Sequence, residues 1–236
     1  MKKTLIIGLF AFVSMFLFSG CIDFLEDITY HRDGSGTYKF TMDMGAIKSM
    51  IDGLGDLGDK DKDEDDSTSP DKKDPTSDIN EKFDELKTKL QVIEGISHFE
   101  SINDTANYVF GFSFDFKNLA ALDKALHKQN DKLATSTVLF SGKKRLLSRS
   151  NKGSLAESFQ KEMMGDDEDS EMAKAMFEDM KMRTVYHFDR KVKSSSNPNS
   201  LISADYKTVT LDYYPLKPEM NKGNMGVGTT IKLKWR

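Results

Sequence analysis

The feature that most constrains the fold is the stretch from Tyr108 to Phe116, in which every second residue is aromatic. Successive side chains of a β-strand point to opposite faces of a sheet, so one strand would place all these rings on one face. The rings are those of Tyr108, Phe110, Phe112, Phe114 and Phe116. That face must be covered by helices, by a second sheet or by a bound ligand. Aromatic residues dominate protein cores, so we expect core packing, with a ligand-lining wall as the alternative.

The N-terminus has the pattern of an export signal. Lys2 and Lys3 precede an apolar run from Leu5 to Phe18, and small residues lead from there to Cys21. A basic segment, an apolar segment and a small-residue cleavage site together form a signal peptide. The run is shorter than the ~20 residues that a transmembrane helix needs. We therefore expect residues 1–20 to be a signal peptide and residues 21–236 to form a single domain.

The sequence Leu17-Phe18-Ser19-Gly20-Cys21 resembles the lipobox of bacterial lipoproteins, although Phe18 stands where leucine is more usual. The resemblance implies that the signal is cut before Cys21, the only cysteine of the chain, and that this residue receives three acyl chains. Two lipid signals are enough for stable membrane attachment. We therefore expect a protein of the cell envelope whose partner through Cys21 is a membrane, the outer membrane in a Gram-negative cell.

A strongly acidic insertion interrupts the domain at about residues 55–78. It carries ten acidic residues and four lysines, and Leu57 is its only large apolar residue. Such a segment buries too little apolar surface to offset its ordering entropy, so we expect disorder. Loss of the signal peptide takes the formal net charge from −4 to −6, and the insertion alone contributes −6. The rest of the domain is then close to neutral, which argues against nucleic acid as a partner.

The acidic insertion also contains an Asp-x-Asp-x-Asp pattern, which is typical of calcium loops. An EF-hand loop that starts at Asp59 needs glycine at its sixth position and glutamate at its twelfth. Glu64 and Pro70 stand there instead. A solvated charge run is therefore favoured over a calcium site.

Strand patterns occur as neighbouring hairpins, and helical patterns occur between them. Asp33-Gly34-Ser35-Gly36 is a turn between the strand patterns at 28–30 and 37–44, and Asn118 is placed to cap a helix. Helical spacing of apolar residues is found at 46–54, 79–93, 119–126, 155–163 and 172–180. Further strand patterns lie at 99–102, 138–147, 186–192, 209–213 and 227–235. This arrangement predicts an α+β fold, an antiparallel, hairpin-rich β-sheet with amphipathic helices packed on one face.

Three motifs resemble the envelope lipoprotein domains related to the mycobacterial LppM type, and the resemblance spans most of residues 24–235. The motifs are the Asp33-Gly34-Ser35-Gly36 turn, the Phe110-Gly111-Phe112-Ser113-Phe114 strand, and the hairpin of Val192-Lys193-Ser194 with Lys207-Thr208-Val209-Thr210. The acidic insertion departs from that pattern. The resemblance implies an envelope lipoprotein that interacts with lipid or with a host surface, and it supplies no catalytic residue.

No sequence motif indicates an enzyme, a metal site or a cofactor. The histidines at positions 31, 98, 127 and 187 lie on separate predicted elements without metal-ligand spacing. A nucleophile elbow, a phosphate-binding glycine loop and a dinucleotide fingerprint are all missing from the sequence. Asp104-Thr105-Ala106 and Asp66-Ser67-Thr68 resemble acceptors for O-glycosylation in exported proteins, but polar turn and linker residues are the favoured interpretation.

Methionines are concentrated between residues 163 and 182, at Met163, Met164, Met172, Met176, Met180 and Met182. Ordinary helix packing is the main expectation, and Cu(I) binding or an adaptable apolar surface are the alternatives. The predicted function is non-enzymatic binding or assembly in the envelope, with a protein partner. The alternative is a carrier or sensor of a lipid, bound between the aromatic strand and Met172, Met176 and Met180.

Overall fold

The computed structural model describes residues 22–45, 48, 77–129, 139–143, 145–150, 179–222 and 228–235. The predicted signal peptide, Cys21, the helix at 46–54 except for Lys48, the acidic insertion up to residue 76 and its Asp-x-Asp-x-Asp pattern lie outside the described residues. So do the helix predicted at 155–163 and residues 172–178 of the helix predicted at 172–180, with Met163, Met164, Met172 and Met176. None of the described helices is both long enough and apolar enough to cross a membrane.

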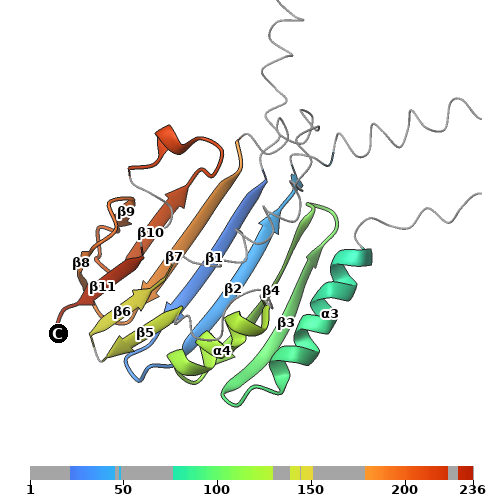
Figure 1. Ribbon diagram of the computed structural model, residues 1–236, viewed down its shortest axis with the longest axis horizontal. Helices are drawn as coiled ribbons and strands as arrows, with labels where there is room; N and C mark the ends of the chain where they lie inside the picture. The colour runs from blue at the N-terminus through green and yellow to red at the C-terminus, as the bar shows by residue number, and fades with distance from the viewer. Residues whose placement is uncertain are drawn as a thin grey trace, which may run out of the picture.

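In the described part of the chain, seven strands form the larger of two sheets (Figure 1). They are β1 (Asp23–Tyr30), β2 (Gly36–Asp43), β3 (Ile96–Asp104), β4 (Val109–Phe116), β7 (Lys181–Phe188), β9 (Ser200–Ile202) and β10 (Thr208–Tyr213). Their order across the sheet is β3-β4-β2-β1-β7-β10-β9. The pair of β1 and β7 is parallel, and every other neighbouring pair is antiparallel.

The smaller sheet contains β5 (Phe140–Lys143), β6 (Leu146–Arg149), β8 (Val192–Ser195) and β11 (Thr229–Leu233), all antiparallel in the order β5-β6-β11-β8. The described residues contain the helices α3 (Ser77–Gln91) and α4 (Leu119–Gln129) and the short 3₁₀ helix η1 (Pro218–Met220). In Figure 1, the small sheet and both α-helices lie on the same side of the large sheet. We call the face of the large sheet beneath them the inner face.

The predicted α+β fold class is therefore wrong, because the described chain is mostly β and its large sheet is mixed. Among the described residues, helices α3 and α4 cover the inner face beside β3 and β4, and a second sheet covers another part of it (Figure 1). The residues of β6 and β11 pair across about 80 positions of sequence, Leu147 with Ile231 for example. Alternation within a strand shows that it is half-buried, but it does not show which sheet the strand joins.

Several local predictions are confirmed. The turn between β1 and β2 is closed by Asp33, whose Oδ1 accepts a hydrogen bond from the Ser35 amide at 3.0 Å. Gly34 has a φ of +96°, which glycine adopts without strain. Asn118 caps α4, since its Oδ1 accepts a bond from the Ala121 amide at 2.9 Å. Asp104 closes a turn onto the Asn107 amide at 3.0 Å, as expected for polar turn residues.

Candidate functional site

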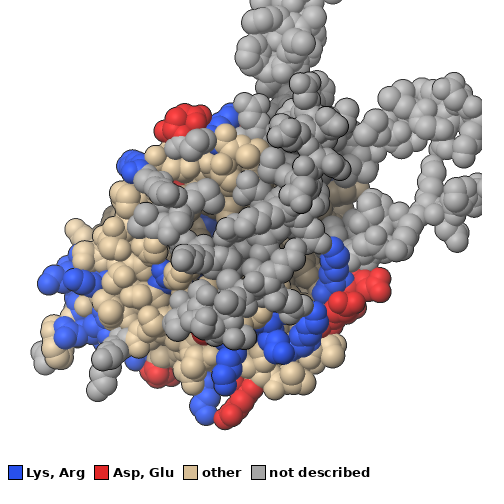
Figure 2. Space-filling view, viewed as in Figure 1, with Lys and Arg blue, Asp and Glu red and all other residues tan. Residues whose placement is uncertain are grey.

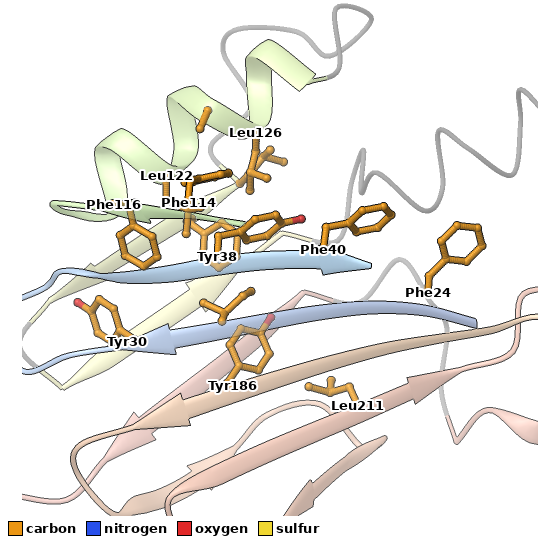
Figure 3. Packing of buried hydrophobic residues seen from close by; sticks show 14 of the residues in the cluster. Phe24, Tyr30, Tyr38, Phe40, Phe114, Phe116, Leu122, Leu126, Tyr186 and Leu211 are labelled. Atoms are coloured by element: carbon orange, nitrogen blue, oxygen red, sulfur yellow. The ribbon is translucent and has the colours of Figure 1, made fainter. Parts of the chain in front are cut away.

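The aromatic stretch forms β4, and its four phenylalanines are fully buried on the inner face. Tyr108 lies before the strand, in a turn with a φ of +54°, with the ammonium of Lys48 5.4 Å from its ring centre. Phe112 packs on Phe99 and on Phe83 of α3, with 5.7 Å between ring centres in each case. Figure 3 shows Leu122 and Leu126 of α4 above Phe114 and Phe116. Met180 belongs to the same buried cluster, and the use of this wall for a ligand stays a prediction.

A buried ion pair lies within this apolar interior, and the sequence interpretation missed it. Arg149 of β6 places Nη2 2.5 Å from Oε2 of Glu26 on β1, and both side chains are buried. Tyr38 donates its hydroxyl hydrogen to Glu26 Oε1 at 2.9 Å. Arg149 Nη1 donates to the Tyr186 hydroxyl at 3.3 Å. The pair therefore joins the two sheets through a network whose polar atoms have partners.

The electrostatics of this network follow from its burial. Burial raises the pKa of the Tyr38 and Tyr186 hydroxyls above the ordinary tyrosine value. Burial opposes the positive charge of Arg149, but the Glu26 carboxylate outweighs it and holds the guanidinium pKa above its ordinary value. Glu26 could have been found from the sequence, because strict alternation places it on the same face as Phe24 and Ile28.

A separate groove of about 430 Å³ opens at the end of the large sheet where β1 turns into β2. We call it the end groove. Its polar side chains come from the β1–β2 turn, from β2, from the start of β3 and from the end of β4: His31, Thr37, Ser97, His98, Asp115 and Lys117. Ile96 and Phe116 supply apolar lining.

An irregularity in β3 builds this groove. The pairing of β3 with β4 shifts register between Ser97 and Glu100, and His98 lies in the bulge with a φ of +50°. A non-glycine residue in this left-handed region is strained by about 1–3 kcal/mol, and such strain and bulges are concentrated at functional sites. His98 places Nδ1 3.0 Å from Asp115 Oδ2, which holds the imidazole at the groove.

Asp115 is the centre of the end groove's polar cluster. Its second oxygen, Oδ1, accepts a hydrogen bond from the Thr37 hydroxyl at 2.7 Å. Hydroxyl and imidazole thus both bind the carboxylate, whereas a catalytic relay needs the hydroxyl to donate to the imidazole. In this arrangement the Thr37 hydroxyl and the His98 imidazole are both oriented on one carboxylate.

The structure brings together two histidines that the sequence analysis placed on separate elements. His31 and His98 both line the end groove, and His31 lies 3.2 Å from a carboxylate oxygen of Asp189. His187 lies 3.3 Å from Asp27, and His127 lies 2.7 Å from the Asp123 carbonyl oxygen. Within the described ranges, no group of three or more His, Cys, Asp or Glu residues is arranged to hold a metal ion.

The chain has a distant structural likeness to a known lipoprotein domain. No protein-family model matches the chain, and no curated protein sequence matches it. Among solved structures, the NMR structure of the folded domain of the Mycobacterium tuberculosis LppM protein is similar at 11% identity and a TM-score of 0.38. The match covers 90% of this chain and 87% of that chain. LppM is also the type that the sequence motifs resemble, but with so distant a likeness a function for this chain has to rest on its own residues.

Proposed function

We propose that this chain is a lipid-anchored protein of a bacterial cell envelope that binds a small polar ligand in the end groove and catalyses no reaction. The lipobox-like sequence around Cys21 supports the anchor. Strand β1 starts at Asp23, two residues after Cys21, and its other end leads into the groove at His31. Eight strand residues span ~26 Å, so an anchor at Cys21 leaves the groove facing away from the membrane.

The observation that carries the binding function is the cluster of Thr37, His98 and Asp115 around one groove. A volume of about 430 Å³ lies in the range of small-molecule sites. Hydrogen bonds at 2.7 and 3.0 Å already orient the hydroxyl and the imidazole on the carboxylate. A ligand would therefore meet groups in place, and little side-chain entropy would be lost on binding.

The lining also indicates what kind of ligand fits. Asp115 offers a carboxylate, Lys117 an ammonium, and His31 and His98 offer imidazole nitrogens, so groups of both charge signs meet one ligand. Such a lining suits a molecule that carries hydroxyl, amine and carboxylate groups. Soluble muropeptides are small envelope molecules of this chemistry and are the probe we choose.

The test is saturation-transfer NMR of muropeptides with the full lipidated chain held in bicelles. We expect transfer with the wild type and its loss in Asp115→Ala, because both oriented groups lose their acceptor. Asp212→Ala is the matched control, since this carboxylate lies on β10, outside the groove lining, and pairs with Arg183 of β7 at 2.6 Å. Equal transfer in folded Asp115→Ala, or no transfer in the wild type, would show that the end groove is not the binding site. A change in the mass of the muropeptide would show that the chain catalyses a reaction.

A second candidate function is that of a lipid carrier or sensor, and the buried polar network favours it. An apolar interior with a few placed polar groups is the composition of a ligand site, and here Arg149, Tyr38 and Tyr186 lie among aromatic rings. Native mass spectrometry of the full chain tests this function. A stoichiometric lipid in addition to the acyl chains on Cys21 would support it, and a mass with those chains alone would exclude it.

A further inference from the structure

Large apolar side chains are exposed together at the end of the molecule that carries the end groove. Trp235 follows β11 and is 78% exposed, and Tyr206, in the turn between β9 and β10, is 48% exposed. Leu201 on the neighbouring edge strand β9 is 61% exposed. Exposed aromatic residues grouped in this way mark an interaction surface more often than single apolar residues do.

Basic residues surround these aromatic side chains. Among the described residues, position 145 and the ranges 189–193, 204–207 and 232–235 contain seven lysines and arginines against two aspartates. The chain as a whole is acidic, with a formal net charge of −4. Figure 2 shows blue side chains gathered on the side of the molecule where β8, β11 and the C-terminus lie. The positive charge is thus local to this end.

Backbone hydrogen bonds join the segments that carry these residues. The Lys234 amide donates to the Lys191 carbonyl at 2.7 Å, and the Leu233 amide donates to the Arg145 carbonyl at 2.9 Å. The Val192 amide donates to the Tyr206 carbonyl at 2.6 Å. Four turns and strand ends therefore form one surface, which we call the basic aromatic end: Arg145, Lys191, Tyr206, Lys207, Lys234 and Trp235.

Two cations of this surface lie over its aromatic rings. The guanidinium of Arg145 lies 3.6 Å from the Trp235 ring centre, and the Lys234 ammonium lies 4.8 Å from the Tyr206 ring centre. The two nearby carboxylates are engaged within the chain. Asp189 accepts a hydrogen bond from the Arg32 amide at 3.2 Å, and Asp205 accepts one from the Lys207 amide at 3.0 Å.

We propose that the basic aromatic end docks on a membrane surface rich in anionic phospholipid. Tryptophan and tyrosine favour the membrane interface, where the ring meets the acyl boundary and the polar group stays hydrated. Lysine and arginine beside them are attracted by the lipid phosphates. The exposed rings suit the acyl boundary of a membrane interface, and the cations beside them suit its phosphate layer. A soluble acidic partner would bind the cations but would give no reason for the exposed Trp235 ring.

The position of this surface gives the docking a direction. Strand β1 begins at the opposite end of the sheet from the β1–β2 turn, ~26 Å away by the rise of eight strand residues. If Cys21 is anchored by lipid, a part of the inference that rests on the proposed function, the basic aromatic end faces a second membrane. The chain would then connect two membrane surfaces across the envelope.

A vesicle-capture experiment tests the docking. The full lipidated chain is inserted in phosphatidylcholine vesicles and mixed with labelled vesicles that contain phosphatidylglycerol. We expect capture of the labelled vesicles, its loss at high salt, and none with labelled phosphatidylcholine vesicles. Trp235→Ala and the double change Lys191→Glu with Lys234→Glu should each reduce capture, the double change by about tenfold or more.

The controls separate docking from folding and from the anchor. Val92→Ala removes an apolar side chain that is 81% exposed elsewhere, and Lys87→Glu reverses an exposed charge on α3, so both should leave capture unchanged. The docking is overturned if capture is the same with and without phosphatidylglycerol. It is also overturned if every folded variant of the basic aromatic end captures vesicles as well as the wild type does. Binding of polyglutamate in place of vesicles overturns it in favour of an acidic protein. A chain that leaves the donor vesicles refutes the anchor alone, and its direct binding to phosphatidylglycerol vesicles still decides the docking.

Discussion

At the residue scale, Gly111 is as important for the aromatic strand as the rings beside it. A Cβ atom at this position would lie 2.1 Å from the Phe40 carbonyl oxygen and 2.9 Å from the Thr41 Cα. Both are backbone atoms of β2, so neither can rotate aside. The absence of a side chain therefore lets β4 pair with β2 along its full length, from Val109 to Phe116.

We predict that Gly111→Ala destabilises the fold by about 1–3 kcal/mol or more, because the backbone of β2 would have to shift to accept one methyl group. Urea unfolding followed by circular dichroism measures the change. Ser113→Ala lies on the same strand and the same face and serves as the control, with little expected effect. A Gly111→Ala midpoint equal to that of the wild type would contradict the close approach of the two strands.

At the element scale, the ion pair of Glu26 and Arg149 is a buried polar link between the large and small sheets. The charges are 2.5 Å apart and buried, so their attraction has to offset the loss of hydration of both groups. Such a pair contributes little net stability compared with apolar residues of the same volume. Loss of one partner is far more costly, because the remaining charge is left in the interior.

We expect Arg149→Met to reduce the free energy of unfolding by about 3–5 kcal/mol, since Glu26 would be buried without its partner. The double variant Glu26→Gln with Arg149→Met should be more stable than Arg149→Met alone. The neutral amide needs no cation, and its oxygen can still accept the Tyr38 hydroxyl. The measurement is a double-mutant cycle from chemical unfolding, and losses that simply add would show that the two charges do not interact.

At the scale of the whole molecule, the buried tyrosines of this network predict how stability depends on alkaline pH. The pKa values of Tyr38 and Tyr186 are raised in the folded state, first of all by burial. The unfolded chain loses these protons near pH 10, whereas the folded chain still holds them. The folded state then binds more protons, so the free energy of unfolding falls as pH rises.

Below about pH 10 we therefore expect no contribution of these tyrosines to the pH dependence, and above it a progressive loss of stability. Urea midpoints measured on both sides of that pH give the slope. Tyr186→Phe should have a shallower alkaline slope than the wild type, whatever its stability at neutral pH. An unchanged slope would mean that the Tyr186 hydroxyl is not the group that resists ionisation.

The two candidate binding surfaces lie at the same end of the large sheet. Strand β1 begins at the opposite end. The end groove and the basic aromatic end share the neighbourhood of His31 and Asp189. Both use turns that join distant strands, so neither is visible in a local stretch of sequence.

The sequence by itself determined the features that depend on residues close along the chain. Alternation from Phe110 to Phe116 gave a buried strand, Asp33 and Gly34 gave the turn, and Asn118 gave a helix cap. Each follows from a period of two or from a hydrogen bond that spans two or three residues. The same kind of reasoning would have placed Glu26 on the buried face, but not its partner.

The tertiary structure alone decided which distant segments meet. It pairs β1 with β7 in parallel, places Arg149 on Glu26, and brings His31 and His98 to one groove. In the described part of the chain, a second sheet and two helices cover the inner face, and this mostly-β arrangement overturned the predicted α+β class. The pairing of β1 with β7 and the contact of Arg149 with Glu26 each join residues more than a hundred positions apart. The alternation of side chains along a strand is the same whichever strand it pairs with, so the sequence pattern does not identify the partner.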